Sequence, residues 1–197
     1  IKRQYDGNRN VDLDESVLWG TVGANVAGGV EGRASYYSQK LGSDVQDVSF
    51  GTTDSPDAWQ FSLAVDQAKL GNFSSFRVEY LKPDENFRAW TDGPWDMYGA
   101  KVTGKELGRY DSVLFLSAEQ KWNNTWTTFE RYLKGSARWN ALPGGALADD
   151  TTNWTVGVRH NYTPALSFEL AYDKIENSET LSDNSDHMVR FRTNIAF

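Results

Sequence analysis

Cysteine is absent from the sequence, and histidine occurs only twice. The absence of cysteine excludes disulfide bonds, thiolate metal sites and cysteine nucleophiles. Long apolar runs are missing as well, and the mean hydropathy is -0.60. No transmembrane helix is therefore expected, because one needs about 18 or more apolar residues in a row, and the stretch from Ile1 lacks the pattern of a signal peptide. Positive charge is also scarce: the net charge of -7 and pI near 4.9 argue against a nucleic-acid partner.

A low hydropathy is typical of soluble proteins, but it does not exclude every membrane protein. A transmembrane barrel places its apolar band on every second residue and gives only a weak signal per segment. Aromatic residues make up 14% of the chain, with eight Trp, nine Tyr and ten Phe. Such enrichment suits rings at a boundary between water and an apolar phase. At 197 residues the chain is expected to form one domain, over residues 1–197.

Period-two alternation predicts about nine strands of roughly ten residues, the length that a tilted strand needs to cross a bilayer. Helical patterns with caps at both ends are nearly missing. The predicted strands are Ser16–Val26, Val30–Gln39, Ala58–Gln67, Ser74–Lys82, Asp111–Trp122, Trp126–Lys134, Asn153–Asn161, Leu166–Lys174 and His187–Phe197.

The connections between these segments alternate between short and long. The short ones carry the Gly, Asn or Pro of tight turns, as in "AGG" and "NNT". The long ones are polar and acidic, and the longest covers 83–110. Short turns at one end and long loops at the other are typical of outer-membrane barrels.

The predicted faces have bulky rings near the segment ends and aliphatic residues between them. In "AWQFSLAVDQ", Trp59, Phe61 and Leu63 share one face, and Gln60 and Ser62 share the other. This pattern predicts an apolar belt with aromatic girdles. A soluble antiparallel sheet with one face on a core is the alternative, but the chain supplies no covering helices.

Two segments fit this scheme poorly. In "WTTFERYLK", Phe129 and Leu133 lie on the same face as Arg131, so either a bulge shifts the register or a plug in the lumen contacts Phe129. The segment 111–122 is apolar on both faces in its outer half.

The chain ends in "VRFRTNIAF", which resembles the C-terminal strand of bacterial outer-membrane β-barrels. In that family the last strand alternates hydrophobic residues and stops on an aromatic residue, and the barrel assembly machinery recognises it. The resemblance therefore implies that Phe197 is an assembly signal. The matching positions are Val189, Phe191, Thr193, Ile195 and Phe197.

The strand count raises a question of parity. Bacterial single-chain barrels have an even number of strands, and the pattern gives about nine. Either residues 1–6 end one more strand, or the chain is the C-terminal part of a larger, roughly 16-stranded barrel. Long loops and many lumen charges favour the larger barrel, since small barrels fill their interior with side chains.

The polar faces supply the candidate pore wall. Arg190 and Arg192 share a face, which predicts a basic wall joined by Arg159 and Arg77, while a salt-bridged wall is the equally favoured alternative. The predicted wall residues are Arg33, Arg77, Arg131, Arg159, Arg190, Arg192, Glu79, Glu169 and Asp173.

In trimeric porins one long loop narrows the channel with acidic residues. The resemblance implies this role for the longest loop, with Asp92 and Asp96 as constriction acids. A surface loop packed on its neighbours is the alternative.

The function expected is passive diffusion of small hydrophilic solutes or ions through a porin in the bacterial outer membrane. Family likeness implies a homotrimer surrounded by outer-membrane lipid, and the loops faintly resemble those of porins with an S-layer homology module. A small barrel of eight to ten strands acting as an adhesin, tether or lipid-modifying enzyme is the alternative. Catalysis is disfavoured because only His160 and His187 could serve it and no GxSxG occurs. No cofactor or metal is expected.

Overall fold

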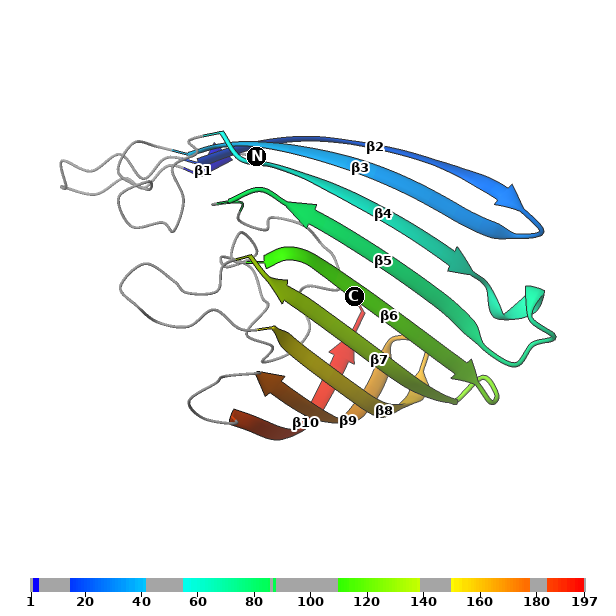
Figure 1. Ribbon diagram of the computed structural model, residues 1–197. Coiled ribbons are helices and arrows are strands. Elements are labelled where there is room, and N and C mark those ends of the chain that lie inside the picture. Colours follow the sequence, from blue (N-terminus) through cyan, green and yellow to red (C-terminus); the bar gives the residue numbers. More distant parts are fainter. Residues whose placement is uncertain are drawn as a thin grey trace.

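The computed structural model is all-β: a single ten-stranded antiparallel sheet in which every strand pairs with its neighbour in the chain (Figure 1). The structure describes residues 2–3, 15–41, 55–85, 87, 110–138, 150–177 and 184–196. The strands are β1 (Lys2–Arg3), β2 (Glu15–Ala27), β3 (Val30–Leu41), β4 (Asp57–Val65), β5 (Ser75–Pro83), β6 (Tyr110–Lys121), β7 (Trp126–Ala137), β8 (Thr151–Thr163), β9 (Leu166–Asn177) and β10 (Asn184–Ile195).

Each of the nine predicted strands is present, with ends shifted by a few residues, and β1 is a two-residue addition paired with Glu15 and Ser16. The strand ends follow the turn residues. Gly28 and Gly29 both have positive φ in the turn between β2 and β3, as a two-residue hairpin turn of type I′ requires. One short connection holds a single 3-10 turn, η1 (Gln67–Lys69), which the strand pattern did not predict.

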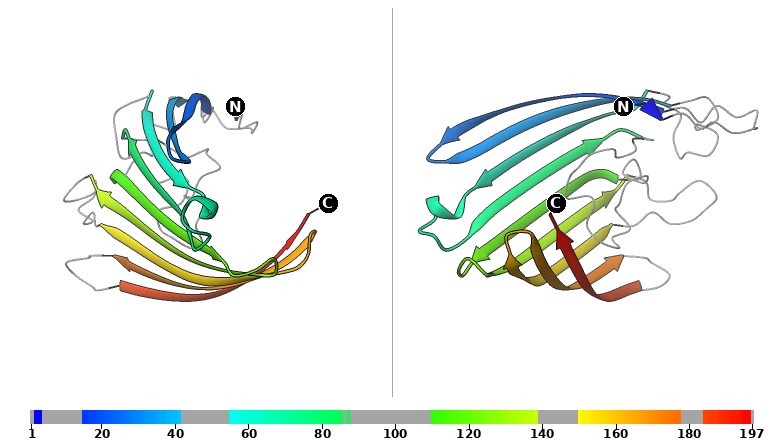
Figure 2. Two further views of the ribbon diagram at one scale, coloured as in Figure 1. Left: turned by 90° about the vertical axis from the view of Figure 1, so that its right-hand side faces the viewer. Right: turned by 180° about the vertical axis from the view of Figure 1, so that it is seen from behind.

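The sheet is strongly curved, and the strand ends joined by short turns lie at the opposite end of the sheet from those joined by the long connections (Figures 1 and 2). It is not closed into a barrel: in the part of the chain that the structure describes, β10 pairs only with β9, and β2 has only the short β1 on its other side. The all-β antiparallel prediction is confirmed, and the predicted closure is not seen in the described residues.

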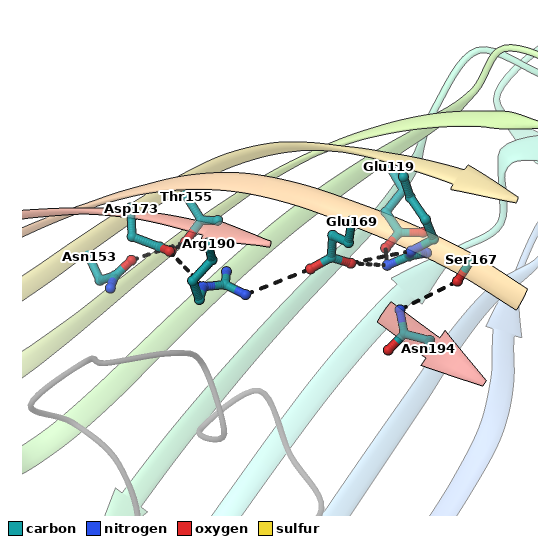
Figure 3. Close-up of polar contacts among 9 residues, drawn as sticks. Glu119, Asn153, Thr155, Ser167, Glu169, Asp173, Arg190 and Asn194 are labelled. Carbon is teal, nitrogen blue, oxygen red and sulfur yellow. Dashed lines mark hydrogen bonds and ion pairs between the residues drawn. The ribbon is translucent and has the colours of Figure 1, made fainter. Parts of the chain in front are cut away.

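The two faces of the sheet differ in burial. One, called the inner face here, carries the buried side chains, and its charged residues project into the hollow of the curved sheet (Figure 3). Its apolar core lies toward the long connections and contains Tyr37, Ala58, Leu81, Phe87, Tyr110, Val113, Phe115 and Leu133. Val113 and Phe115 of β6 lie in this core, whereas Leu116 lies on the opposite face, called the outer face here. β6 is therefore apolar on both faces in the half nearer the long connections.

The irregular pattern of β7 is not caused by a bulge, and a plug formed by the long connections would lie outside the described residues. No register shift interrupts the pairing of Trp126–Gly135 with β8; shifts lie at Asn25/Ala27, Tyr110/Ser112 and Asn161/Thr163. Phe129 is fully buried and directly opposite Gly157. A Cβ at position 157 would lie 2.7 Å from Cε2 of Phe129, so the ring occupies the space that glycine leaves open.

Candidate functional site

The cross-strand registers place all the predicted wall residues on the inner face. Directly opposed residues in an antiparallel sheet share a face. Ser62 is opposite both Arg33 and Glu79, so these residues share one face. Glu169 is opposite both Arg159 and Arg192, which therefore also share a face. The other members occupy positions of the same parity on their strands, namely Arg77, Arg131, Asp173 and Arg190.

Charged side chains of β8, β9 and β10 form a continuous network on this face (Figure 3). Arg190 Nε donates to Asp173 Oδ2 over 2.9 Å, and Arg190 Nη1 lies 3.8 Å from Glu169 Oε1. The other oxygen of Glu169 accepts from Arg159 Nη2 at 3.1 Å and from Nε at 3.3 Å. Arg159 Nη2 also lies 3.9 Å from Glu119 Oε1 on β6, which extends the network across four strands.

The backbone register explains this arrangement. Glu169 and Asp173 are four residues apart on β9, about 13 Å, and point to the same face. Arg190 is directly opposite Ala171, midway between them, so one guanidinium can reach both carboxylates. The short side chain of Ala171, which is itself buried, leaves room for that guanidinium.

The acidic members are the most buried part of the network. The side chain of Asp173 is fully buried and that of Glu169 is 3% exposed, whereas Arg159 is 27% exposed. The Thr155 hydroxyl donates to Asp173 Oδ1 at 2.5 Å and lies 3.1 Å from Asn153 Oδ1. Buried carboxylates need such compensation, because desolvation is costly without a cation and hydrogen bonds.

A second polar group lies on β3, β4 and β5. Glu79 is fully buried, forms an ion pair with Arg77, and accepts a hydrogen bond of 3.0 Å from Gln60 Nε2. The Tyr37 hydroxyl donates to Gln60 Oε1 at 2.6 Å. Arg33 forms an exposed pair with Glu31 at 2.6 Å. This half of the inner face therefore also alternates cations and anions.

Basic residues outnumber acidic ones among the described side chains of the inner face, although the whole chain is acidic. The inner face thus combines features of the two interpretations left open by the sequence: several of its charges form ion pairs, and its described side chains carry more positive than negative charges. The basic residues are Arg33, Arg77, Lys121, Arg131, Arg159, Arg190 and Arg192, and the acidic ones are Glu31, Glu79, Glu119, Glu169 and Asp173.

The outer face carries exposed apolar residues between two rows of rings. Toward the long connections, Tyr36 packs on Trp59 and Tyr132 on Trp154, with ring centroids 4.7 and 4.4 Å apart. Toward the short turns, Trp126 packs on His160 at 4.4 Å. Exposed aliphatic and aromatic side chains fill the band between these rows, including Phe61, Leu63, Val78, Val156, Leu170, Val189 and Phe191.

The two histidines lie on the outer face at opposite ends of the sheet. His160 belongs to the row of rings near the short turns, and His187 forms a hydrogen bond with the Tyr172 hydroxyl near the long connections. In the described part of the chain, no group of three or more His, Asp or Glu side chains is placed to hold a metal ion.

Several predicted or contributing residues need separate mention. Asp92, Asp96 and Phe197 lie outside the described residues. The sequence did not single out Thr155 or Gly157, because their roles depend on which residue stands opposite them on the next strand. A glycine within a strand, as at position 157, is the signal that could have indicated a close approach.

No helix in the described residues is long and apolar enough to cross a membrane. Comparison with protein-family models and with curated proteins finds no match for this sequence.

Proposed function

We propose that the chain forms the wall of an outer-membrane porin, a passive diffusion channel for small hydrophilic solutes or ions. The observation that carries this proposal is the distribution of polarity between the two faces. Large apolar side chains such as Phe61, Leu170 and Phe191 are about half exposed or more on the outer face, while ion pairs line the inner face. In a membrane channel, lipid would surround the apolar outer face and water would contact the charged inner face.

Strand direction supports closure by further strands. Because successive strands are antiparallel, β2 and β10 run in the same direction and cannot pair antiparallel with each other. β1 has the opposite direction, which pairing with β10 would need, but in the described residues it covers only Glu15 and Ser16 of β2, so most of the β2 edge is left open to further strands. We infer a closed barrel in which additional strands join these edges, with roughly 16 strands in total.

The side chains of the edge strands support the same inference. Leu18 and Val22 on β2, and Val189 and Phe191 on β10, are among the most exposed apolar residues of the outer face. Edge strands that remain free in water usually carry charges or prolines that block pairing. Exposed apolar edges of this kind favour paired strands in lipid.

The proposed partners rest on this location and on the resemblance to outer-membrane barrels. Outer-membrane lipid contacts the apolar face, the barrel assembly machinery recognises the C-terminal segment with Phe197 as its signal, and three copies form a homotrimer. Carboxylates of the inner-face ion pairs such as Glu79 and Glu169 are buried. Their partners Arg77 and Arg159 are partly exposed and would face a water-filled lumen, which would favour small hydrophilic solutes without any cofactor.

Purification in the absence of detergent tests the membrane location. We expect the protein to aggregate in plain buffer, because the outer face exposes a continuous apolar band, and to remain dispersed in detergent micelles. Reconstituted into planar bilayers, it is expected to give discrete ion-conducting steps. A monodisperse protein in plain buffer that adds no conductance to the bilayer would contradict the proposal.

The constriction acids are tested by the double variant Asp92→Asn, Asp96→Asn. If the loop narrows the channel, removing two negative charges should lower cation permeability relative to chloride, read as a shift in reversal potential under a salt gradient. The matched control is Asp84→Asn, an exposed acid at the end of β5. Unchanged conductance and selectivity in the double variant would remove the constriction role.

A further inference from the structure

The apolar band of the outer face is interrupted at one place among the described residues, on β6 and β7. Gln120, Thr128 and Glu130 lie there between the two rows of rings, where the other strands present Phe, Leu, Val or Ala. We call these three residues the outer polar cluster. Thr128 and Glu130 are the polar outer-face residues of β7, as Phe129 and Leu133 are its apolar inner-face residues, and together they explain why β7 did not fit the belt pattern.

Hydrogen bonds join the cluster internally. The indole N–H of Trp122 donates to Thr128 Oγ1 at 2.9 Å, and the Thr128 hydroxyl donates to Gln120 Oε1 at 2.9 Å. Gln120 Nε2 donates to Glu130 Oε2 at 3.0 Å and to Ser74 Oγ at 3.3 Å. The cluster is therefore an ordered surface and holds its carboxylate in a defined position.

The Glu130 carboxylate is incompletely compensated. It is exposed, and within the described residues it has no ion-pair partner and one hydrogen-bond donor, Gln120. It lies four residues, about 13 Å of strand, from Trp126 and two residues from Tyr132, so it is inside the band that lipid would cover. Hydrocarbon offers no donor, and a charge in this band is unfavourable.

The chain's own sheet does not cover this surface. β7 lies within the sheet with β6 and β8 on either side, and further strands would join at its two ends, at the edge formed by β1 and β2 and at β10. Since none of the described strands covers the cluster, we infer that the covering surface comes from another molecule that is itself largely apolar and that carries hydrogen-bonding groups at the same depth.

We propose that a second copy of this chain covers the outer polar cluster, so that the clusters of neighbouring copies meet. Copies inserted in the same orientation hold their clusters at the same depth, and each cluster contains both donors and acceptors. Gln120 and Thr128 of one copy can then compensate Glu130 of the next, while Leu116 and Val156 pack around them. This inference rests on the membrane location proposed above, but not on the number of copies.

The absence of cysteine permits a direct test, because one introduced thiol is unique. Thr128→Cys is compared with Leu170→Cys, whose position lies on the same face and in the same cross-strand row two strands away. In proteoliposomes, copper-catalysed oxidation is expected to convert most of the Thr128→Cys protein to a disulfide-linked dimer and to leave Leu170→Cys monomeric. Equal cross-linking of both, or of neither, would overturn the proposal.

A second variant tests whether the polar groups hold the copies together. Adding Gln120→Leu and Glu130→Leu to Thr128→Cys is expected to reduce cross-linking to the level of Leu170→Cys. Undiminished cross-linking would show that the cluster does not hold the copies together. Conductance of the same vesicles separates the two proposals: channels without cross-linking refute only the contact, and cross-linking without channels refutes only the porin assignment.

Discussion

Replacement of Arg190 by methionine is expected to lower the free energy of unfolding by about 3–5 kcal/mol, the usual cost of leaving buried carboxylates without their cation. Arg190 is the residue that bridges Asp173 and Glu169, and both acids are almost completely buried. Urea-induced unfolding in detergent micelles, followed by tryptophan fluorescence, measures the loss.

The matched control for Arg190 is Arg33→Met on the same face. The Arg33–Glu31 pair is exposed, with side-chain exposures of 55% and 45%, so its loss should cost at most about 1 kcal/mol. Adding Asp173→Asn to Arg190→Met removes one unpaired charge and should recover part of the stability. Equal losses of unfolding free energy in Arg190→Met and Arg33→Met would contradict this expectation. They would mean that water screens the ion pairs of Arg190 as much as the exposed pair of Arg33.

Replacement of Gly157 by valine is expected to be comparably damaging. The new side chain would overlap the ring of Phe129, which would have to leave its buried site on the wall. Losing the burial of a phenylalanine costs about 3–5 kcal/mol. The guanidinium groups of Arg131 and Arg159, whose Cζ atoms lie 4.4 and 5.6 Å from the ring centroid, would lose their contact as well.

The same unfolding measurement applies to the Gly157 variant, with Gly20→Val as the control. A Cβ at Gly20 meets nothing within 4 Å, and valine favours strands, so that variant should unfold within about 0.5 kcal/mol of the parent. Combining Gly157→Val with Phe129→Ala should cost less than the sum of the two single changes, since both remove one contact. Full additivity would show that the ring and the glycine do not depend on each other.

The sequence could predict on which face each residue lies, but it could not predict the cross-strand contacts on which the two expected losses depend. Strand positions and faces followed from alternation, because side chains in a strand point to opposite sides with a period of two. Thus Trp59, Phe61 and Leu63 lie together on the outer face as predicted, and the wall residues lie together on the inner face. The face on which a side chain lies depends only on its position in its own strand, so it can be inferred for each strand separately.

Contacts between strands could not be predicted in the same way. Phe129 meets Gly157, and Arg190 lies between Glu169 and Asp173, only because of the register between adjacent strands. A shift of that register would change every partner while leaving each strand's own pattern in place. For this reason the sequence left a bulge and a plug open as explanations for Phe129; the regular register excludes the bulge, and a plug formed by the long connections would lie outside the described residues.

The amino-acid sequence by itself determined an all-β antiparallel chain with one apolar and one charged face, since alternation is a local property of each segment. Only the tertiary structure decided that the charged wall is paired rather than uniformly basic, and that Gln120, Thr128 and Glu130 form one polar cluster within the outer band. The physical reason is that ion pairs and hydrogen bonds join residues on different strands, and their distances depend on register and curvature.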